Sequence, residues 1–306
     1  MTPMDIGYDK PLFLLPFDHR SSFERGLFGF VDPLSPEQTE AVRRMKRVVY
    51  DGFRAAIRNG VPGDAAGILV DEELGADILK DARAAGFITC TSVEKSGQDE
   101  LVFEYGAEWK QHLDAMDPTF AKVLVRYNPE GNPERNARQR TNLRALSAHV
   151  HETSRRLMFE LLVPATAAQA DHYEGNMKLY DEELRPHLAA RAMHELQDAG
   201  VEVDVWKLEG LSRRDDGELL VHTAQREGRD HVGCIVLGRG SDEAGIIAWL
   251  RTAAKVRGFV GFAVGRASFW DALVALRDGK IGRDEAVAKI AARYVEWVNV
   301  FQRPTA

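Results

Sequence analysis

The feature that most constrains the fold is a regular alternation of short apolar runs with longer segments of helical spacing. This alternation is the pattern of parallel strands joined by crossover helices. The predicted strands are Leu12–Phe17, Gly67–Val70, Phe87–Val93, Ala121–Tyr127, Leu157–Val163, Val201–Leu208, His231–Leu237 and Phe259–Val264. Eight strand–helix units predict an α/β chain folded as one closed (β/α)8 TIM barrel, which we expect to span residues 1–306 as a single domain.

The segments between these strands predict the outer helices. They cover Glu40–Asn59, Ala76–Ala85, Pro133–Thr153 and Asp242–Val256, with one or two helices in 167–199 and two more after the last strand, separated near Gly279–Gly282. A doubly wound open sheet is the competing architecture. It would usually carry a glycine-rich turn after the first strand, whereas the turn here is Asp18-His19-Arg20-Ser21-Ser22-Phe23.

Composition narrows the classes of partner. Hydrophobic residues make up 44% and charged residues 28% of the chain, and the net charge of −7 is spread over interleaved acids and bases. No basic block predicts binding to nucleic acid or to a membrane surface. No apolar run approaches the roughly 18 residues of a membrane span, and no leader pattern is present, so we expect a cytoplasmic protein. Cys90 and Cys234 lack metal or redox spacing and are expected to be buried. Homo-oligomerisation is left open.

Lys207 is the strongest chemical signal in the sequence. It lies within Val203–Gly210, in the sixth predicted strand. Lysine is rarely buried without a partner or a function, and a desolvated amine is more readily the neutral nucleophile that condenses with a carbonyl. Barrels build their sites at the carboxyl ends of strands. We therefore predict that Lys207 forms an imine, with Lys95, which also follows a strand, as the reserve candidate.

Strand alternation predicts that two further charges point into the barrel with Lys207. Lys122 and Glu160 occupy the inward face of the fourth and fifth strands, whereas Trp206 and Leu208 suit the helix-covered face. Two lysines beside one carboxylate are costly to bury unless they are used. We expect Glu160 to act as acid and base, and Lys122 to favour the neutral form of Lys207 and to contact the substrate. The alternative is that each is an isolated strand-end charge that reaches solvent.

Two glycine–arginine turns follow the seventh and eighth strands. Barrels often bind phosphate there, through backbone N–H groups, a helix N-terminus and a cationic side chain, and glycine lets the backbone come close. The expected phosphate-binding residues are Gly238, Arg239, Gly240, Gly265 and Arg266. Ordinary turn glycines are the alternative explanation.

Polar residues after the other strands complete the predicted site. Substrate contacts are expected from Asp18, His19, Arg20, Glu94, Lys95, Arg126 and Glu209. A divalent metal on Asp18, Asp71 and Glu94 is an alternative, and it would make the chain a metal-dependent aldolase or sugar-phosphate isomerase. A barrel that binds a sugar phosphate without catalysis is another. The sequence has no His-rich zinc set, so we expect neither a metal nor another cofactor.

Motifs along essentially the whole chain resemble one family. They are Leu14–Phe23, Val93–Glu100, Phe103–Gly106, Arg126–Pro129, Glu160–Pro164, Trp206–Gly210, Leu237–Gly240 and Ala263–Trp270. Together they resemble the 2-deoxy-5-keto-D-gluconate 6-phosphate aldolase family of inositol catabolism. The resemblance implies retro-aldol cleavage of a small phosphorylated keto sugar acid to dihydroxyacetone phosphate and malonate semialdehyde. In that family a sugar-kinase domain often precedes this domain, and the 306 residues contain no kinase region.

A more distant likeness is to class I tagatose-bisphosphate aldolases. Those enzymes have an acidic turn after strand one, a lysine on strand four, a glutamate on strand five and an imine lysine on strand six. The likeness would map these roles onto Asp18, Lys122, Glu160 and Lys207. The chain departs from that pattern at His19, where those enzymes usually have glutamine. The likeness implies Schiff-base chemistry without a metal.

Overall fold

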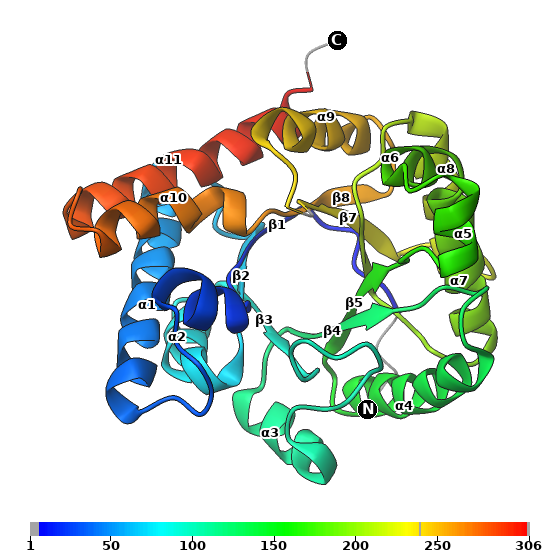
Figure 1. Cartoon of the computed structure of the whole chain (residues 1–306), viewed down its shortest axis with the longest axis horizontal. Coiled ribbons are helices and arrows are strands. Elements are labelled where there is room, and N and C mark those ends of the chain that lie inside the picture. Colours follow the sequence, from blue (N-terminus) through cyan, green and yellow to red (C-terminus); the bar gives the residue numbers. More distant parts are fainter. Residues whose placement is uncertain (1–5, 239, 305–306) are drawn as a thin grey trace.

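Eight parallel strands close into a barrel in the computed structural model, which describes residues 6–238 and 240–304 (Figure 1). The strands are β1 (Leu12–Pro16), β2 (Ala66–Leu69), β3 (Ile88–Ser92), β4 (Phe120–Arg126), β5 (Arg156–Leu162), β6 (Val205–Leu208), β7 (Gly233–Leu237) and β8 (Phe259–Ala263). They follow one another in chain order around the ring, and β8 pairs with β1. The predicted (β/α)8 TIM barrel is confirmed.

Closure between β8 and β1 depends on a glycine. A Cβ atom at Gly261 would lie 1.7 Å from the carbonyl oxygen of Leu12, so no larger residue fits at this pairing. The predicted strands agree with the observed ones within two residues, except the sixth. It was predicted from Val201 but begins at Val205, because the buried carboxylate of Asp204 accepts hydrogen bonds from the backbone N–H groups of Gly7 and Leu157 and holds the preceding segment outside the ladder.

The predicted outer helices are present. They are α1 (Pro36–Arg58), α2 (Glu72–Ala84), α4 (Pro133–Glu152), α9 (Glu243–Ala254), α10 (Arg266–Arg277) and α11 (Arg283–Gln302). The first two begin about one turn earlier than predicted. Ser35 forms a capping box with Gln38 at the start of α1, and Asp71 accepts a hydrogen bond from the N–H of Leu74 at the start of α2.

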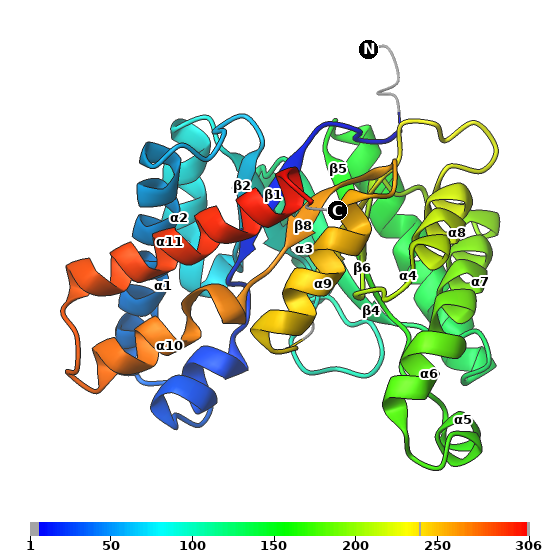
Figure 2. The same cartoon turned by 90° about the horizontal axis from the view of Figure 1, so that it is seen from above.

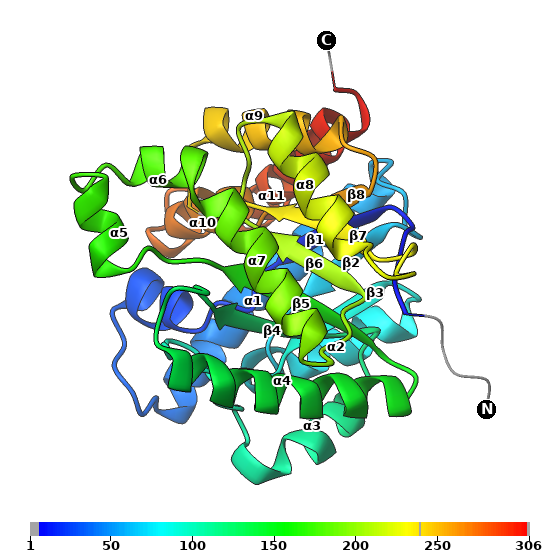
Figure 3. The same ribbon diagram turned by 90° about the vertical axis from the view of Figure 1, so that its right-hand side faces the viewer.

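Several short elements were not predicted. They are η1 (Ser22–Leu27), η2 (Gly106–Glu108), α3 (Trp109–Met116) and α8 (Arg214–Ala224). The segment 167–199 forms three helices rather than one or two, namely α5 (Ala167–His172), α6 (Met177–Glu183) and α7 (Arg185–Asp198). Figures 2 and 3 show α5 and α6 projecting beyond the barrel, at the end opposite the start of β1. No helix of the described ranges is long and apolar enough to cross a membrane.

The barrel interior is an apolar plug. Its members are Leu12, Leu14, Leu69, Cys90, Phe120, Met158, Val205, Ile235 and Ala263. A second and larger core lies between the strands and the helices. Cys90 belongs to the interior and Cys234 to the outer core, and both are buried and free, as predicted. The apolar plug closes the barrel below the site.

Candidate active site

A layer of charged side chains lies directly above the apolar plug. Lys122 follows Phe120 by two residues on β4, and Lys207 follows Val205 by two on β6. Glu160 stands in the same relation to Met158 on β5 and pairs in register with Lys207. The predicted convergence of three charges from three consecutive strands is confirmed.

Glu160 joins the two lysines. Its Oε2 lies 2.8 Å from Nζ of Lys207 and 2.9 Å from Nζ of Lys122. Lys122 also donates to Oε1 of Glu94 at 2.6 Å and to Oδ2 of Asp18 at 2.9 Å. The side chains of Lys122 and Lys207 are only 2% and 5% exposed. Three carboxylates and two amines therefore form one buried cluster, called the lysine cluster below.

The neighbouring charges in this cluster shift the pKa values of its members toward their charged forms. Burial alone would raise the pKa of Asp18, but Lys122, His19 and Lys207 hold it well below its usual value. Burial would likewise raise the pKa of Glu160, and the two lysines lower it. For Lys122 burial opposes the charged form, yet the three carboxylates hold its pKa well above the ordinary range. Lys122 thus remains an ammonium ion, which makes it a poor nucleophile.

At two neighbouring groups, burial shifts the pKa toward the neutral form instead. Burial raises the pKa of Glu94 in spite of Lys122, and burial lowers the pKa of His19 in spite of Asp18. Among the described residues, four buried polar atoms here have no hydrogen-bond partner: Nδ1 of His19, Nε of Arg20, Oε2 of Glu94 and Oγ of Ser92. Unsatisfied buried polar atoms are uncommon and mark this end of the barrel as a place for a ligand.

The lysine cluster opens into two cavities, of about 510 Å³ and about 240 Å³. We call the larger the α10 lobe, because the start of α10 lines it, and the smaller the β3 lobe, because Ser92 and Glu94 line it. His19, Glu160 and Lys207 line both. Lys207 consequently stands where the two lobes meet.

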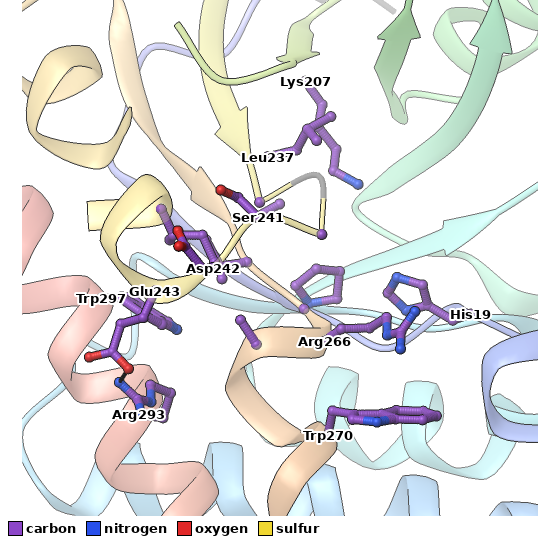
Figure 4. Close-up of a pocket in the computed structure, with 18 of the residues that line it drawn as sticks. His19, Lys207, Leu237, Ser241, Asp242, Glu243, Arg266, Trp270, Arg293 and Trp297 are labelled. Atoms are coloured by element: carbon purple, nitrogen blue, oxygen red, sulfur yellow. Dashed lines mark ion pairs between the residues drawn. The ribbon is translucent and has the colours of Figure 1, made fainter. Parts of the chain in front are cut away.

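The α10 lobe contains the predicted phosphate-binding turns. Gly238, Gly240, Gly265 and Arg266 line it, while Arg239 lies outside the described residues. A Cβ atom at Gly265 would lie 2.5 Å from the carbonyl oxygen of Pro16, so this turn requires glycine. Figure 4 shows Arg266, His19 and Lys207 among the side chains that line this lobe.

Arg266 packs against an aromatic ring. Its guanidinium lies 4.4 Å from the ring centroid of Trp270, and the residue is exposed at the lobe. Sequence reasoning missed Trp270 and also Ser241, which lines the lobe after β7. The Gly-Arg-Ala-Ser-Phe-Trp motif contained Trp270, but its spacing alone did not show that the ring would support Arg266.

The cationic residues of the β3 lobe are mostly engaged with protein atoms. Arg20 forms an ion pair with Glu104 and donates to the carbonyl of Glu94 at 2.7 Å, and Arg126 donates to the carbonyl of Gln98 at 2.9 Å. Lys95 lines the lobe but is exposed. Arg20 and Arg126 therefore hold the loop after β3 in place, as well as bordering the lobe.

Two predicted arrangements are not assembled. Glu209 lines neither lobe, because its carboxylate accepts a hydrogen bond from the N–H of Val163 and lies 3.8 Å from Arg185. The structure therefore does not bring Glu209 to either lobe with the other predicted contacts.

Asp71 is separated from the other carboxylates of the alternative metal set. It pairs with the buried Lys46 of α1 and caps α2, and it lines neither lobe, so it does not join Asp18 and Glu94. Over residues 6–238 and 240–304, no group of three or more His, Cys, Asp or Glu side chains is arranged to hold a metal ion. The carboxylates that do meet are joined by Lys122.

Comparison with known proteins places the chain in a family and supports the barrel. Residues 7–305 match the model of DUF2090, described as an uncharacterized protein conserved in bacteria. A search of curated proteins gave no match.

Solved structures that resemble the chain include Cgl0159 from Corynebacterium glutamicum, with 16% identity, a TM-score of 0.56 and coverage of 97% of this chain and 88% of that one. A fructose-bisphosphate aldolase from Slackia heliotrinireducens has 15% identity, a TM-score of 0.53 and coverage of 92% and 86%. A Schiff base forming fructose-1,6-bisphosphate aldolase has 14% identity, a TM-score of 0.54 and coverage of 94% and 93%. At these identities the likeness shows a shared barrel fold.

Proposed function

The chain belongs to the DUF2090 family, and from its own site we propose that it is a class I aldolase, forming a Schiff base with a small phosphorylated keto sugar acid. One observation carries the proposal. Lys207 is a buried amine 2.8 Å from the carboxylate of Glu160, at the junction of two lobes. A buried lysine beside a proton acceptor and facing a cavity is the arrangement that imine chemistry requires.

Glu160 supplies the proton transfers of imine formation. The ammonium of Lys207 passes a proton to Oε2 of Glu160, and the free amine attacks the substrate ketone. Glu160 then returns this proton to the hydroxyl of the resulting carbinolamine, and the hydroxyl leaves as water. The imine nitrogen, once protonated, draws in the electron pair of the carbon–carbon bond that breaks. Lys122 keeps Glu160 in position through a contact of 2.9 Å.

Lys207 suits this role better than the other two lysines of the site. The pKa of Lys122 is held well above its ordinary range by Asp18, Glu160 and Glu94 against the effect of burial, so Lys122 keeps its proton. Lys95 is exposed on the loop after β3, whereas the side chain of Lys207 is 5% exposed and lies directly above the plug. We accordingly assign to Lys122 the task of orienting the carboxylates. The earlier expectation that it favours a neutral Lys207 has less support, because three carboxylates offset its charge.

The α10 lobe suits the phosphate of such a substrate. The N-terminal turn of α10 and the guanidinium of Arg266 face a space bordered by the glycine turns Gly238, Gly240 and Gly265. The carbonyl carbon would then lie at Lys207, with the rest of the chain in the β3 lobe. This placement, together with the sequence resemblance, supports 2-deoxy-5-keto-D-gluconate 6-phosphate as substrate and dihydroxyacetone phosphate and malonate semialdehyde as products.

Reductive trapping tests the proposal. The protein is incubated with dihydroxyacetone phosphate, reduced with borohydride and digested, and peptides with added mass are located by mass spectrometry. We expect an adduct on Lys207 that is lost in Lys207→Met and retained in Lys255→Met, a control at an exposed lysine of the outer surface. An adduct on Lys95 or Lys122 would overturn the assignment of the nucleophile. No adduct, with turnover that a chelator abolishes and a divalent ion restores, would replace the Schiff-base reaction by a metal-dependent one.

A further inference from the structure

The backbone around Glu94 is fixed by several hydrogen bonds in the loop after β3. Arg20 donates to its carbonyl at 2.7 Å, and Glu94 itself forms an antiparallel bridge with Phe103. The flanking backbone continues this bridge, with the N–H of Glu104 donating to the carbonyl of Val93 at 3.0 Å. Such support fixes the direction in which the Glu94 side chain leaves the backbone. It is the kind of support that catalytic groups require.

The two oxygens of the Glu94 carboxylate have different surroundings. Oε1 accepts from Nζ of Lys122 at 2.6 Å, whereas Oε2 is buried and has no partner. Oγ of Ser92, two residues earlier on the same face of the chain, is also buried and unpartnered. Both residues are 9% exposed and line the β3 lobe. Two unsatisfied polar groups on one wall of a cavity call for a ligand that can hydrogen-bond to both, and a hydroxyl group can.

Glu160 is less suited to take a proton from such a hydroxyl. Its Oε2 is already bound by two ammonium groups at 2.8 and 2.9 Å, and the lysines hold its pKa below the usual value against the effect of burial. Glu94 contacts one ammonium, and burial raises its pKa. A base with a pKa closer to the working pH is the more effective one.

We propose that Glu94 is the general base that removes the proton from the substrate hydroxyl during carbon–carbon cleavage, and that Ser92 positions this hydroxyl. The inference rests on the proposed Schiff-base function and divides its proton transfers between two carboxylates. Glu160 serves the formation and hydrolysis of the imine. Glu94 accepts the proton that is released when the carbon–carbon bond breaks.

The step balances without a further reactant. In the protonated imine on Lys207, the hydroxyl lies on the second carbon from the imine carbon. Glu94 takes the hydroxyl proton, the O–H electron pair forms the carbonyl of the leaving aldehyde, and the electron pair of the broken carbon–carbon bond moves into the imine to give an enamine. Proton return to the enamine carbon and addition of water then release the ketone product and Lys207.

A small side-chain rotation brings the free oxygen to the hydroxyl. The terminal torsion of glutamate has a broad minimum, so Oε2 can turn toward the β3 lobe at little cost. Oε1 keeps Lys122 as its partner during this rotation, because the Nζ group donates along several directions. Lys122 thereby becomes the common support of both carboxylate bases.

Glu94→Gln separates this role from imine formation. We expect it to retain borohydride trapping of dihydroxyacetone phosphate on Lys207 within a few-fold, because Gln still offers an oxygen to Lys122. Cleavage of 2-deoxy-5-keto-D-gluconate 6-phosphate, and condensation of dihydroxyacetone phosphate with malonate semialdehyde, should fall by about 10²- to 10⁴-fold. The acidic limb of the kcat profile should also disappear. Glu72→Gln is the matched control, since Glu72 bonds His112 at the same end of the barrel and lines neither lobe.

The outcomes distinguish the two proposals. Wild-type cleavage rates in Glu94→Gln would overturn the role of Glu94 while leaving the Schiff base intact. Loss of trapping and cleavage together, in a variant with a normal circular-dichroism spectrum, would also overturn it, because Glu94 would then act only by supporting Lys122. If Glu94→Gln does not fold, Glu94→Asp, which keeps a base, should retain more cleavage than Glu94→Ala relative to trapping, and equal ratios would contradict the proposal. A wild-type protein that forms no adduct on Lys207, or that forms it without turnover, would instead overturn the proposed function.

Discussion

Replacing Lys122 by methionine is the sharpest test of how the site is held together. The substitution keeps the length of the side chain and removes the cation that, among the described residues, contacts all three of Asp18, Glu94 and Glu160, at 2.9, 2.6 and 2.9 Å. Lys207 remains, but it contacts only Glu160 within this cluster. Two carboxylates would then be buried without a cation in contact.

The expected loss of stability is large. Removing one partner from a buried ion pair costs about 3 to 5 kcal/mol, because it leaves an uncompensated charge in the interior. Lys122 is 2% exposed and satisfies three carboxylates, so we expect a loss at the upper end of this range. Single domains are typically stable by about 5 to 15 kcal/mol, so Lys122→Met should fold with a narrow margin. Lys289→Met is the control, because Lys289 forms an exposed pair with Glu285 at 3.4 Å, which is worth about 0.3 to 0.5 kcal/mol.

The free energy of unfolding should also depend on pH, in a direction that follows from the pKa shifts. In the wild type the folded pKa values of Asp18 and Glu160 are lowered, so their contribution to stability is present above their unfolded pKa values and is lost only as the pH falls through the folded ones. Without Lys122, burial raises the folded pKa values of the carboxylates that it paired. A carboxyl group whose folded pKa is raised destabilises the protein once the pH exceeds its unfolded pKa, near 4. Stability of Lys122→Met should therefore fall more steeply between pH 5 and pH 8 than that of the wild type, in which Glu94 is the one carboxyl of the three whose pKa burial raises.

Urea unfolding at pH 5, 6.5 and 8, followed by tryptophan fluorescence and circular dichroism, measures both effects. A free energy of unfolding within 1 kcal/mol of the wild type at pH 8 would refute the reasoning. So would a variant whose stability rises with pH over this range. Either result would mean that water or rearranged side chains compensate the carboxylates, and that Lys122 is not their common support.

Two further predictions concern the α10 lobe and the opposite end of the barrel. Arg266→Ala should raise KM for a phosphorylated substrate about 10- to 100-fold with little change in kcat, because a charge-assisted hydrogen bond is worth about 1.5 to 3 kcal/mol. Steady-state kinetics measure this effect, and an unchanged KM would place the phosphate elsewhere. Asp204→Ala should lower the free energy of unfolding by about 2 to 4 kcal/mol, because the buried N–H groups of Gly7 and Leu157 lose their acceptor, and a loss below 1 kcal/mol would show that water replaces it.

The period of a β-strand was sufficient to find the centre of the site. Lys122, Glu160 and Lys207 converge because residues two apart share a face, and each follows a plug residue by that spacing. Glu209 was expected at the site because it follows the sixth predicted strand, and that position did not determine the direction of its side chain. The chain leaves the pleat after Leu208, so parity no longer determines direction, and Arg185 and the N–H of Val163 take the carboxylate.

Contacts between segments remote in sequence were beyond prediction. Nothing in the pattern of α1 shows that Lys46 is buried against Asp71, and this pair separates Asp71 from the other acidic strand-end residues. The ion pair of Arg20 with Glu104 joins two loops, whose relative placement no periodicity determines. These contacts decide which of the predicted polar residues are available to a ligand and which support the loops.

The boundary between plug and charged layer explains why this cluster can exist. On β3, β4, β5 and β6 an apolar plug residue is followed two positions later, on the same face of the strand, by a polar one. These polar residues are Ser92, Lys122, Glu160 and Lys207 respectively. The plug excludes water from below, so the charges are compensated mainly by one another, and the cluster contains more acidic than basic groups at its core. An incoming anionic substrate is therefore attracted less by the cluster than by Arg266 at the rim of the α10 lobe, while the cluster itself supplies bases. In the proposed function, recognition of the anion and proton transfer would thus fall to two different lobes, and for this reason we expect Arg266→Ala to act on KM and Glu94→Gln on kcat.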